Sequence, residues 1–408
     1  MDFANRINDL GTETAFEVLG QVMKLRAQGK EITSFCIGEP DFNTPENIKQ
    51  AGIKAIENNQ THYTASAGLF EVRETVAKYV NKIRGTNYSA KNIVILPCAK
   101  GVIFFTVMAL VNPGDEVIYP NPGYPIYESA IDFFGGKRVA LPMLEEKGFS
   151  FDLTDLMSRI TDKTKLIILN SPQNPTGGVI PKKDLEKLAE VCKEKGIYVL
   201  SDEIYSQIMY DTEFNSIASI PGMEELTVIL DGVSKTYAMT GWRAGYAVCN
   251  KELAGKFETL ATNIVANTAT FTQFAIKEAL TGPQEEPKKM VQEFKERRDI
   301  IVDLLNEVPG FKCHKPLGAF YVFPNVTQTV KKLGFRNATD LQQYLLLKAN
   351  VAVLTRNHFG KKNPGETQEY LRLSYATDKE TIKKGLQQIK DAIANKELIE
   401  EFKKEKGI

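Results

Sequence analysis

Short apolar runs recur through the middle of the chain, and stretches of helical spacing lie between them. The runs cover residues 93–96, 116–119, 165–170, 198–202 and 227–231, and a helical stretch covers 182–195. Each run is continuously apolar rather than alternating, which is typical of strands covered on both faces. The pattern therefore predicts an α/β fold whose mostly parallel central sheet is flanked by helices.

The pattern changes near Gly282. A proline-bounded, charge-dense stretch begins a long amphipathic helix there, followed by a short strand near 319–323 and a highly charged helix from Asp378 onward. Close to the N-terminus a helix over 16–28 has no partner in the central sheet. We expect three parts: an N-terminal segment (1–44) packed on a small domain, a large domain (45–284) and the small α+β domain itself (285–408).

Composition narrows the classes of partner. Lys plus Arg (51) balances Asp plus Glu (51), which argues against nucleic acid and anionic membranes as partners. The most apolar stretch, 101–111, is too short to span a bilayer, and the charged N-terminus does not resemble a signal peptide. Five dispersed cysteines fit a reducing compartment, and three isolated histidines argue against a metal site. We expect a cytoplasmic protein that acts on small molecules and binds no metal.

The strongest chemical signal is the string SKTYAMTGWRAG at 234–245. It follows a buried strand, so Lys235 emerges at the carboxyl end of that strand, where α/β sheets bind ligands. A lysine in an apolar pocket can lose its proton and form a Schiff base. Arg243 can fold back toward the same place, where a guanidinium suits a phosphate. The alternative is a surface lysine with an exposed arginine in a polar turn.

Other motifs add polar groups at strand ends and turns. Asn174 lies in the turn SPQNPTGG, and Asp202 ends a buried strand. Residues 98–101 link a strand to a helix N-terminus, which offers free N–H groups to phosphate. Arg372 lies inside an apolar run, where an arginine needs an anion. Each has a structural alternative: an ordinary turn at Asn174, a helix N-cap at Asp202 and a buried ion pair for Arg372. Tyr124, an aromatic residue in the proline-rich turn NPGYP, could stack on a ligand ring or simply pack in the core.

These motifs, in this order, resemble those of the class I/II aminotransferases of pyridoxal 5′-phosphate (PLP) fold type I, over nearly the whole chain from Phe16. The resemblance implies a PLP-binding large domain, a smaller α+β domain and a homodimer with shared active sites. It implies that Lys235 is the covalent anchor of PLP. Around the ring it places Asp202 at the pyridine nitrogen, Tyr205 and Asn174 at O3′, and Tyr124 stacked on the ring face. The phosphate would be held by the amides of Ala99 and Lys100 together with Ser234 and Arg243. It also assigns Tyr63 to the phosphate of the neighbouring subunit, and Gly38, Asn174 and Arg372 to the substrate carboxylate.

By the same resemblance we expect a ping-pong aminotransferase that moves an amino group from an L-amino acid to a 2-oxo acid, with Lys235 as general base and acid. Lys100 suits a distal carboxylate and so favours an aspartate-like donor, but alanine and aromatic donors stay open. Equally, Lys100 can point to solvent or support the phosphate. Another PLP reaction, such as a C–S β-lyase, a cyclopropane-forming synthase or an amino-acid oxidase or hydroxylase, would keep every cofactor motif.

Overall fold

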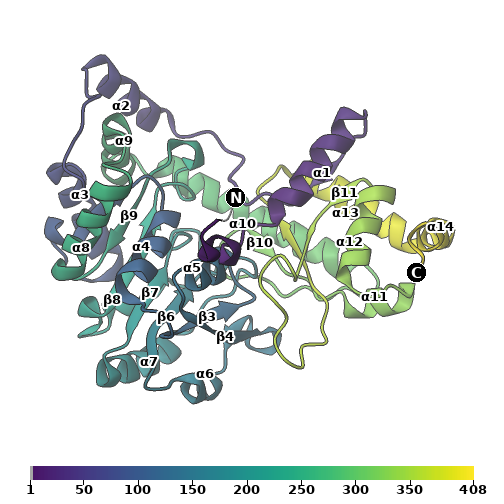
Figure 1. Cartoon of the computed structure of the whole chain (residues 1–408). Helices are drawn as coiled ribbons and strands as arrows, with labels where there is room; N and C mark the ends of the chain where they lie inside the picture. Colours follow the sequence, from purple (N-terminus) through teal and green to yellow (C-terminus); the bar gives the residue numbers. More distant parts are fainter. Residues whose placement is uncertain (1–2) are drawn as a thin grey trace.

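A computed structural model describes residues 3–408, and its largest element is an eight-stranded sheet (Figure 1). The strand order is β2-β9-β8-β7-β6-β3-β4-β5. The strands are β2 (Ile93–Leu96), β3 (Glu116–Asn121), β4 (Lys137–Leu144), β5 (Ser150–Phe151), β6 (Thr164–Asn170), β7 (Tyr198–Asp202), β8 (Thr227–Gly232) and β9 (Gly245–Val248). Each of the five apolar runs forms one of these strands, so the expected strands are confirmed.

The sheet is mostly parallel, as predicted. The pairs β3–β4, β3–β6, β6–β7 and β7–β8 are parallel. Strand β9 runs antiparallel between β2 and β8, and the short β5 runs antiparallel to β4. The carboxyl ends of β6, β7 and β8 therefore lie at one edge of the sheet.

Both faces of this sheet are buried, which explains the continuous apolar runs. In β6, Leu166 and Ile168 belong to the core cluster that contains helix α4, whereas Ile167 and Leu169 belong to the cluster that contains helix α7. The helices are α1 (Ala15–Ala27), α2 (Glu46–Glu57), α3 (Phe70–Arg84), α4 (Lys100–Leu110), α5 (Ile126–Phe133), α6 (Leu153–Arg159), α7 (Lys182–Lys195), α8 (Lys251–Ile264), α9 (Thr270–Thr281), α10 (Glu285–Asn306), α11 (Thr327–Leu333), α12 (Ala338–Lys348), α13 (Lys379–Ala394) and α14 (Lys396–Lys406).

Two small sheets lie beside the large one. Strands β10 (Tyr321–Val322), β13 (Leu371–Ser374) and β12 (Leu354–Thr355) form an antiparallel sheet, and β1 (Thr33–Ser34) pairs in parallel with β11 (Val351–Ala352). Helix α1 lies over this part of the molecule (Figure 1), and Val18 and Val22 of α1 share a core cluster with Phe323 and Leu354.

Three predicted elements differ from the structure. The strand expected at 319–323 contains only Tyr321 and Val322, because Ala319 has a positive φ of 57° that breaks extended geometry. The single C-terminal helix is two helices, since Asn395 has an extended backbone and its side chain caps α14 at Leu398 N. The N-terminal helix spans Ala15–Ala27 rather than 16–28. Among residues 3–408, no helix is long and apolar enough to cross a membrane.

Candidate active site

A cavity of about 450 Å³ lies where the carboxyl ends of β6, β7 and β8 face the small antiparallel sheet. Its size and its place at strand ends are those of a small-molecule site in an α/β fold. The large sheet contributes residues around Asn174, Asp202 and Lys235, the small sheet contributes residues around Arg372, and the N-terminal segment contributes residues around Glu13.

Lys235 is the buried amine of this cavity. Its Nζ donates a hydrogen bond of 2.6 Å to the carbonyl of Gly38. Burial lowers its pKa to about 8, although the carboxylates of Glu39 and Glu13 act in the opposite direction. A glycine is needed at position 38, because a Cβ there would overlap the hydroxyl of Tyr321. The amine is thus close to losing its proton near neutral pH, as nucleophilic lysine chemistry requires.

Asp202 lies at the floor of the cavity, at the end of β7. The hydroxyl of Tyr127 donates to its Oδ2 at 2.6 Å, and the amide of Ile204 donates to its Oδ1 at 3.3 Å. Burial raises the pKa of Asp202 to about 6, while the bond from Tyr127 lowers it. No helix begins here, so the alternative reading of Asp202 as a helix cap is wrong.

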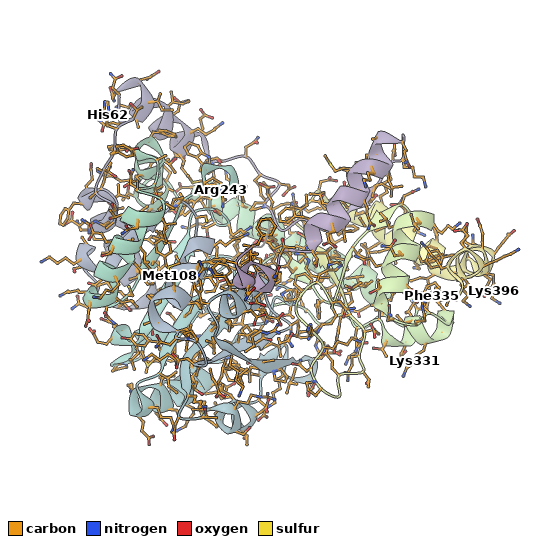
Figure 2. The ribbon with its side chains drawn as sticks, in the orientation of Figure 1. His62, Met108, Arg243, Lys331, Phe335 and Lys396 are labelled. Atoms are coloured by element: carbon orange, nitrogen blue, oxygen red, sulfur yellow. The ribbon has the colours of Figure 1, made fainter. Side chains whose placement is uncertain are left out.

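Backbone amides and two side chains gather where a phosphate would fit. Ala99 is the N-cap of α4, and the first amides of a helix have no intrahelical partner. Ser234 and Arg243 line the same cavity, with Arg243 exposed at a φ of 53° in the turn before β9. Figure 2 shows Arg243 near the middle of the molecule. Gly245 keeps the Ala99 loop close, because a Cβ there would lie 2.6 Å from the Ala99 Cα.

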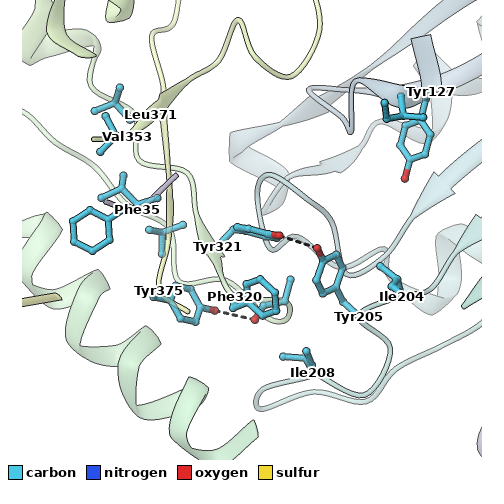
Figure 3. Packing of buried hydrophobic residues seen from close by; sticks show 14 of the residues in the cluster. Phe35, Tyr127, Ile204, Tyr205, Ile208, Phe320, Tyr321, Val353, Leu371 and Tyr375 are labelled. Atoms are coloured by element: carbon cyan, nitrogen blue, oxygen red, sulfur yellow. Dashed lines mark hydrogen bonds between the residues drawn. The ribbon is translucent and has the colours of Figure 1, made fainter. Parts of the chain in front are cut away.

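Tyr205 and Asn174 also line the cavity. Tyr205 shares a hydroxyl–hydroxyl bond of 2.8 Å with Tyr321 of β10 (Figure 3). The Asn174 backbone amide donates to Asn170 Oδ1 at 2.9 Å, which fixes the turn. The Asn174 Oδ1 atom is buried without a partner among residues 3–408. A buried, unpaired amide oxygen is costly in an empty core and is therefore typical of a ligand site.

Arg372 has a buried guanidinium that forms no ion pair with any of residues 3–408. One Nη donates to the carbonyl of Cys36, and Nε is buried without a hydrogen-bond partner within the described residues. The guanidinium lies 4.7 Å above the ring of Tyr321 and 5.3 Å from that of Phe359. Burial lowers its pKa, and no carboxylate of residues 3–408 forms an ion pair with it. The alternative of a structural ion pair is therefore wrong, and the group is free to bind an anion.

Lys100 and Tyr124 both contact the carboxylate of Glu13. Lys100 forms an ion pair with Glu13, and the Tyr124 hydroxyl donates to the same carboxylate oxygen at 2.6 Å. The sequence offered a distal substrate carboxylate, solvent or phosphate as partners of Lys100; the protein side chain that pairs with it is Glu13, and its role toward a ligand stays a prediction. Tyr124 is not core filler, because it lines the cavity and packs edge-to-face on Tyr127 at 5.8 Å.

Tyr63 is the one expected site residue outside this cavity. It follows His62, which Figure 2 labels at the upper left of the molecule, in the loop after α2, and its side chain is 89% exposed. The single chain therefore does not bring Tyr63 to its own Lys235, and its assignment to a neighbouring subunit stays a prediction.

Several cavity residues were missed from the sequence, and four of them matter most for the charge and shape of the site: Glu13, Tyr127, Tyr321 and His358. Tyr127 could have been found, because it lies three residues after Tyr124, in the turn that begins α5, where its amide donates to the Tyr124 carbonyl at 3.0 Å. The other three reach the cavity through long-range packing, and nothing in their neighbouring sequence marks them as site residues.

Comparison with known proteins places this geometry in a family. The class I and II aminotransferase family model matches residues 30–389. A probable aspartate/prephenate aminotransferase of Aquifex aeolicus is 40% identical over 96% of this chain and 98% of its own. The aspartate aminotransferase of Rhizobium meliloti superposes with a TM-score of 0.91 at 33% identity, over 97% of this chain and 99% of its own. An aromatic aminotransferase of Pyrococcus horikoshii gives a TM-score of 0.85 at 34% identity, over 93% and 100%. The chain belongs to the class I and II aminotransferases.

Proposed function

We propose that the protein is a PLP-dependent aminotransferase that uses Lys235 as the amine for its cofactor and Arg372 to bind the α-carboxylate of its substrates. One observation carries this proposal: one cavity is lined by a buried lysine, whose pKa is lowered to about 8, and by a buried arginine that has no counter-ion in the described part of the chain. Neither group is explained by the packing of the chain, because each is a cation that burial penalises.

The residues of the cavity fit PLP. The helix N-terminus at Ala99, with Ser234 and Arg243, would hold the phosphate. Asp202, at the buried floor, would pair with the pyridine nitrogen, and a protonated nitrogen would in turn keep Asp202 ionised. The side-chain NH2 of Asn174 and the hydroxyl of Tyr205 are donors that suit the phenolic oxygen, and Tyr124 offers a ring to stack on the pyridine.

When bound, PLP supplies the electron sink that lets an amino acid lose its Cα proton. The protein then has four tasks. Arg372 orients the amino acid by its carboxylate. The amine of Lys235 would take the Cα proton and return it, as base and then acid, for which an amine of lowered pKa is suited. Asp202 keeps the ring nitrogen charged, and the aromatic walls around Tyr321 and Phe359 limit access of water.

We propose an aspartate-like amino donor, with neutral donors such as alanine or aromatic amino acids also accepted. The names of the relatives support this range, since they include aspartate/prephenate and aromatic aminotransferases. Lys100 supports the acidic part of the range, because it provides a cation in the same cavity as Arg372.

We further propose a homodimer in which Tyr63 completes the partner's phosphate site. Large apolar side chains are exposed around it on α2, α3 and the end of α8: Ile53, Ile56, Phe70, Ile264 and Val265. A concentration of exposed apolar groups is typical of a subunit interface.

We also propose domain limits near 44/45 and 284/285. The strands of the two small sheets support them, because these strands use only residues 33–34 and 321–374.

A donor panel tests the reaction. The protein, loaded with PLP, is incubated with single L-amino acids and either 2-oxoglutarate or pyruvate. The proposal predicts a new amino acid formed in equal amount to the oxo acid produced from the donor. Ammonia released without a new amino acid would instead support a lyase or an oxidase.

A further inference from the structure

The acid of the N-terminal segment, Glu13, is placed inside the cavity. It precedes α1 and lines the same cavity as Lys100, Lys235 and Arg372. Only 18% of its side chain is exposed, compared with 40% for its ion-pair partner Lys100. Its negative charge also raises the pKa of both Lys235 and Arg372, two groups that line the cavity with it.

The position of Glu13 does not depend on Lys100 alone. The next residue, Thr14, bonds His358 Nδ1 at 2.7 Å, and the carbonyl of Gly11 accepts from Ser129 Oγ at 3.1 Å. The Tyr124 hydroxyl holds the carboxylate itself. The segment is thus tied to the large sheet side through Ser129 and to the small sheet side through His358, with Glu13 between them.

Lys100 is therefore already neutralised before any substrate arrives. A substrate with a distal carboxylate must compete with Glu13 for this ammonium group and approach a like charge. A substrate with a neutral side chain leaves the Glu13–Lys100 pair intact and leaves no charge in the cavity uncompensated. The subsite is therefore charge-balanced when the substrate side chain is neutral, and it carries one excess negative charge when that side chain is a carboxylate.

We propose that Glu13 is an internal counter-ion that shares Lys100 with the distal carboxylate of the substrate, and so sets the balance between acidic and neutral substrates. This inference rests on the proposed function and assigns a specificity role to a residue of the same site. Glu13 touches the side-chain subsite and takes no part in proton transfer.

Ligand binding tests the inference without turnover. Succinate and butanoate have four carbons and share one carboxylate for Arg372, but only succinate has a second carboxylate for Lys100. Their dissociation constants are measured by calorimetry on the PLP-loaded protein and its variants. Glu13→Gln removes the competing charge, so succinate should bind about fivefold more tightly, the upper value for a partly exposed ion pair. Butanoate binding should not change.

Glu17→Gln is the matched control. It makes the same charge change in α1, one turn further on, at an exposed side chain outside the cavity. It should leave both ligands unchanged. Lys100→Met should weaken succinate, and adding Glu13→Gln to Lys100→Met should bring no tightening, because the competition needs the ammonium group.

Equal effects of Glu13→Gln on succinate and butanoate, or no effect on either, would overturn the inference. The same would follow if the tightening persisted with Lys100→Met. Turnover gives an independent reading: Glu13→Gln should raise kcat/KM for aspartate and not for alanine or phenylalanine. If the unmodified protein transaminates no donor, the proposed function fails, whereas the binding comparison still decides the role of Glu13.

Discussion

Two buried arginines of the small antiparallel sheet region, one just after β12 and one in β13, have opposite surroundings. Arg356, which follows β12, is fully buried and donates to both carboxylate oxygens of Glu366, at 2.7 and 3.0 Å. Its remaining groups bind the side chain of Asn121 at 2.8 Å and the carbonyl of Gly360 at 2.9 Å. Arg372, opposite Leu354 in the sheet register, has no carboxylate partner among residues 3–408 and one unpaired nitrogen.

The difference distinguishes a structural arginine from a binding arginine. The chain provides a complete set of acceptors for Arg356, which fixes the loop that carries His358 and Phe359 into the cavity. Within residues 3–408 it does not provide an acceptor for every N–H group of Arg372, so a ligand carboxylate can accept the remaining hydrogen bonds. Groups left incomplete in a site lower the stability of the fold and raise its capacity to bind. Lys235 belongs with Arg372 in this respect.

Removing the cavity amine should have the largest effect. Lys235→Ala removes both the cofactor's amine and the proton carrier, so we expect transamination to fall by at least about 10⁴-fold. The thermal unfolding midpoint of the PLP-free protein should not fall, because a cation penalised by burial is lost. Rate assays and calorimetric unfolding check both. The surface change Lys277→Ala is the control, and a Lys235→Ala protein with normal turnover would contradict the assignment.

Arg372→Leu should come next. Losing the carboxylate clamp should lower kcat/KM for every amino donor by about 10³-fold, equivalent to a buried charge pair broken in the complex. Folding should be nearly unaffected, because no internal counter-ion is left behind. Steady-state kinetics and urea unfolding measure the two quantities. A large loss of unfolding free energy with kcat/KM preserved would make Arg372 structural.

Arg356→Leu should lower the free energy of unfolding, in contrast to Arg372→Leu, which should lower kcat/KM. Glu366 would be left buried without its cation, which should lower the free energy of unfolding by about 3 kcal/mol. Replacing Glu366 by Leu as well should recover part of that loss, because no charge remains unpaired. Urea unfolding of the two variants provides the measurement. If kcat/KM fell while the urea midpoint stayed the same, Arg356 would belong to the site.

The smallest expected effect is the pH dependence of PLP binding, which distinguishes a buried lysine from an exposed one. Because the pKa of Lys235 is lowered to about 8, the fraction of free amine should rise roughly tenfold per pH unit below that value and level off above it. The rate of PLP uptake by the PLP-free protein should follow the same curve, monitored by absorbance from pH 6 to 10. A rise that continues to pH 10 would show an ordinary exposed lysine.

The sequence was sufficient for the parts of the molecule that local pattern controls. Continuous apolar runs predicted five of the eight strands of the large sheet, because burial on both faces removes alternation. Motifs at strand ends gave Lys235, Asp202 and Asn174, because parallel strands bring their carboxyl ends to one edge. Arg372 was recognisable because an arginine inside an apolar run requires an anion.

Long-range packing could not be predicted. Glu13 is 87 residues from Lys100 in the chain, and Tyr205 is 116 residues from Tyr321. Such pairs are determined by how the small sheet and the N-terminal segment lie against the large sheet, which no local pattern encodes. The short extent of β10 and the break at Asn395 depend on single backbone conformations at Ala319 and Asn395, and periodicity does not report these.

The central claim is that the amine of Lys235 holds the cofactor, and one measurement tests it most directly. The PLP-treated protein is reduced with borohydride, digested, and its labelled peptide is identified by mass spectrometry. The account predicts one pyridoxyl group per chain, on the peptide that contains Lys235. A label on another lysine, or none at all, would contradict it.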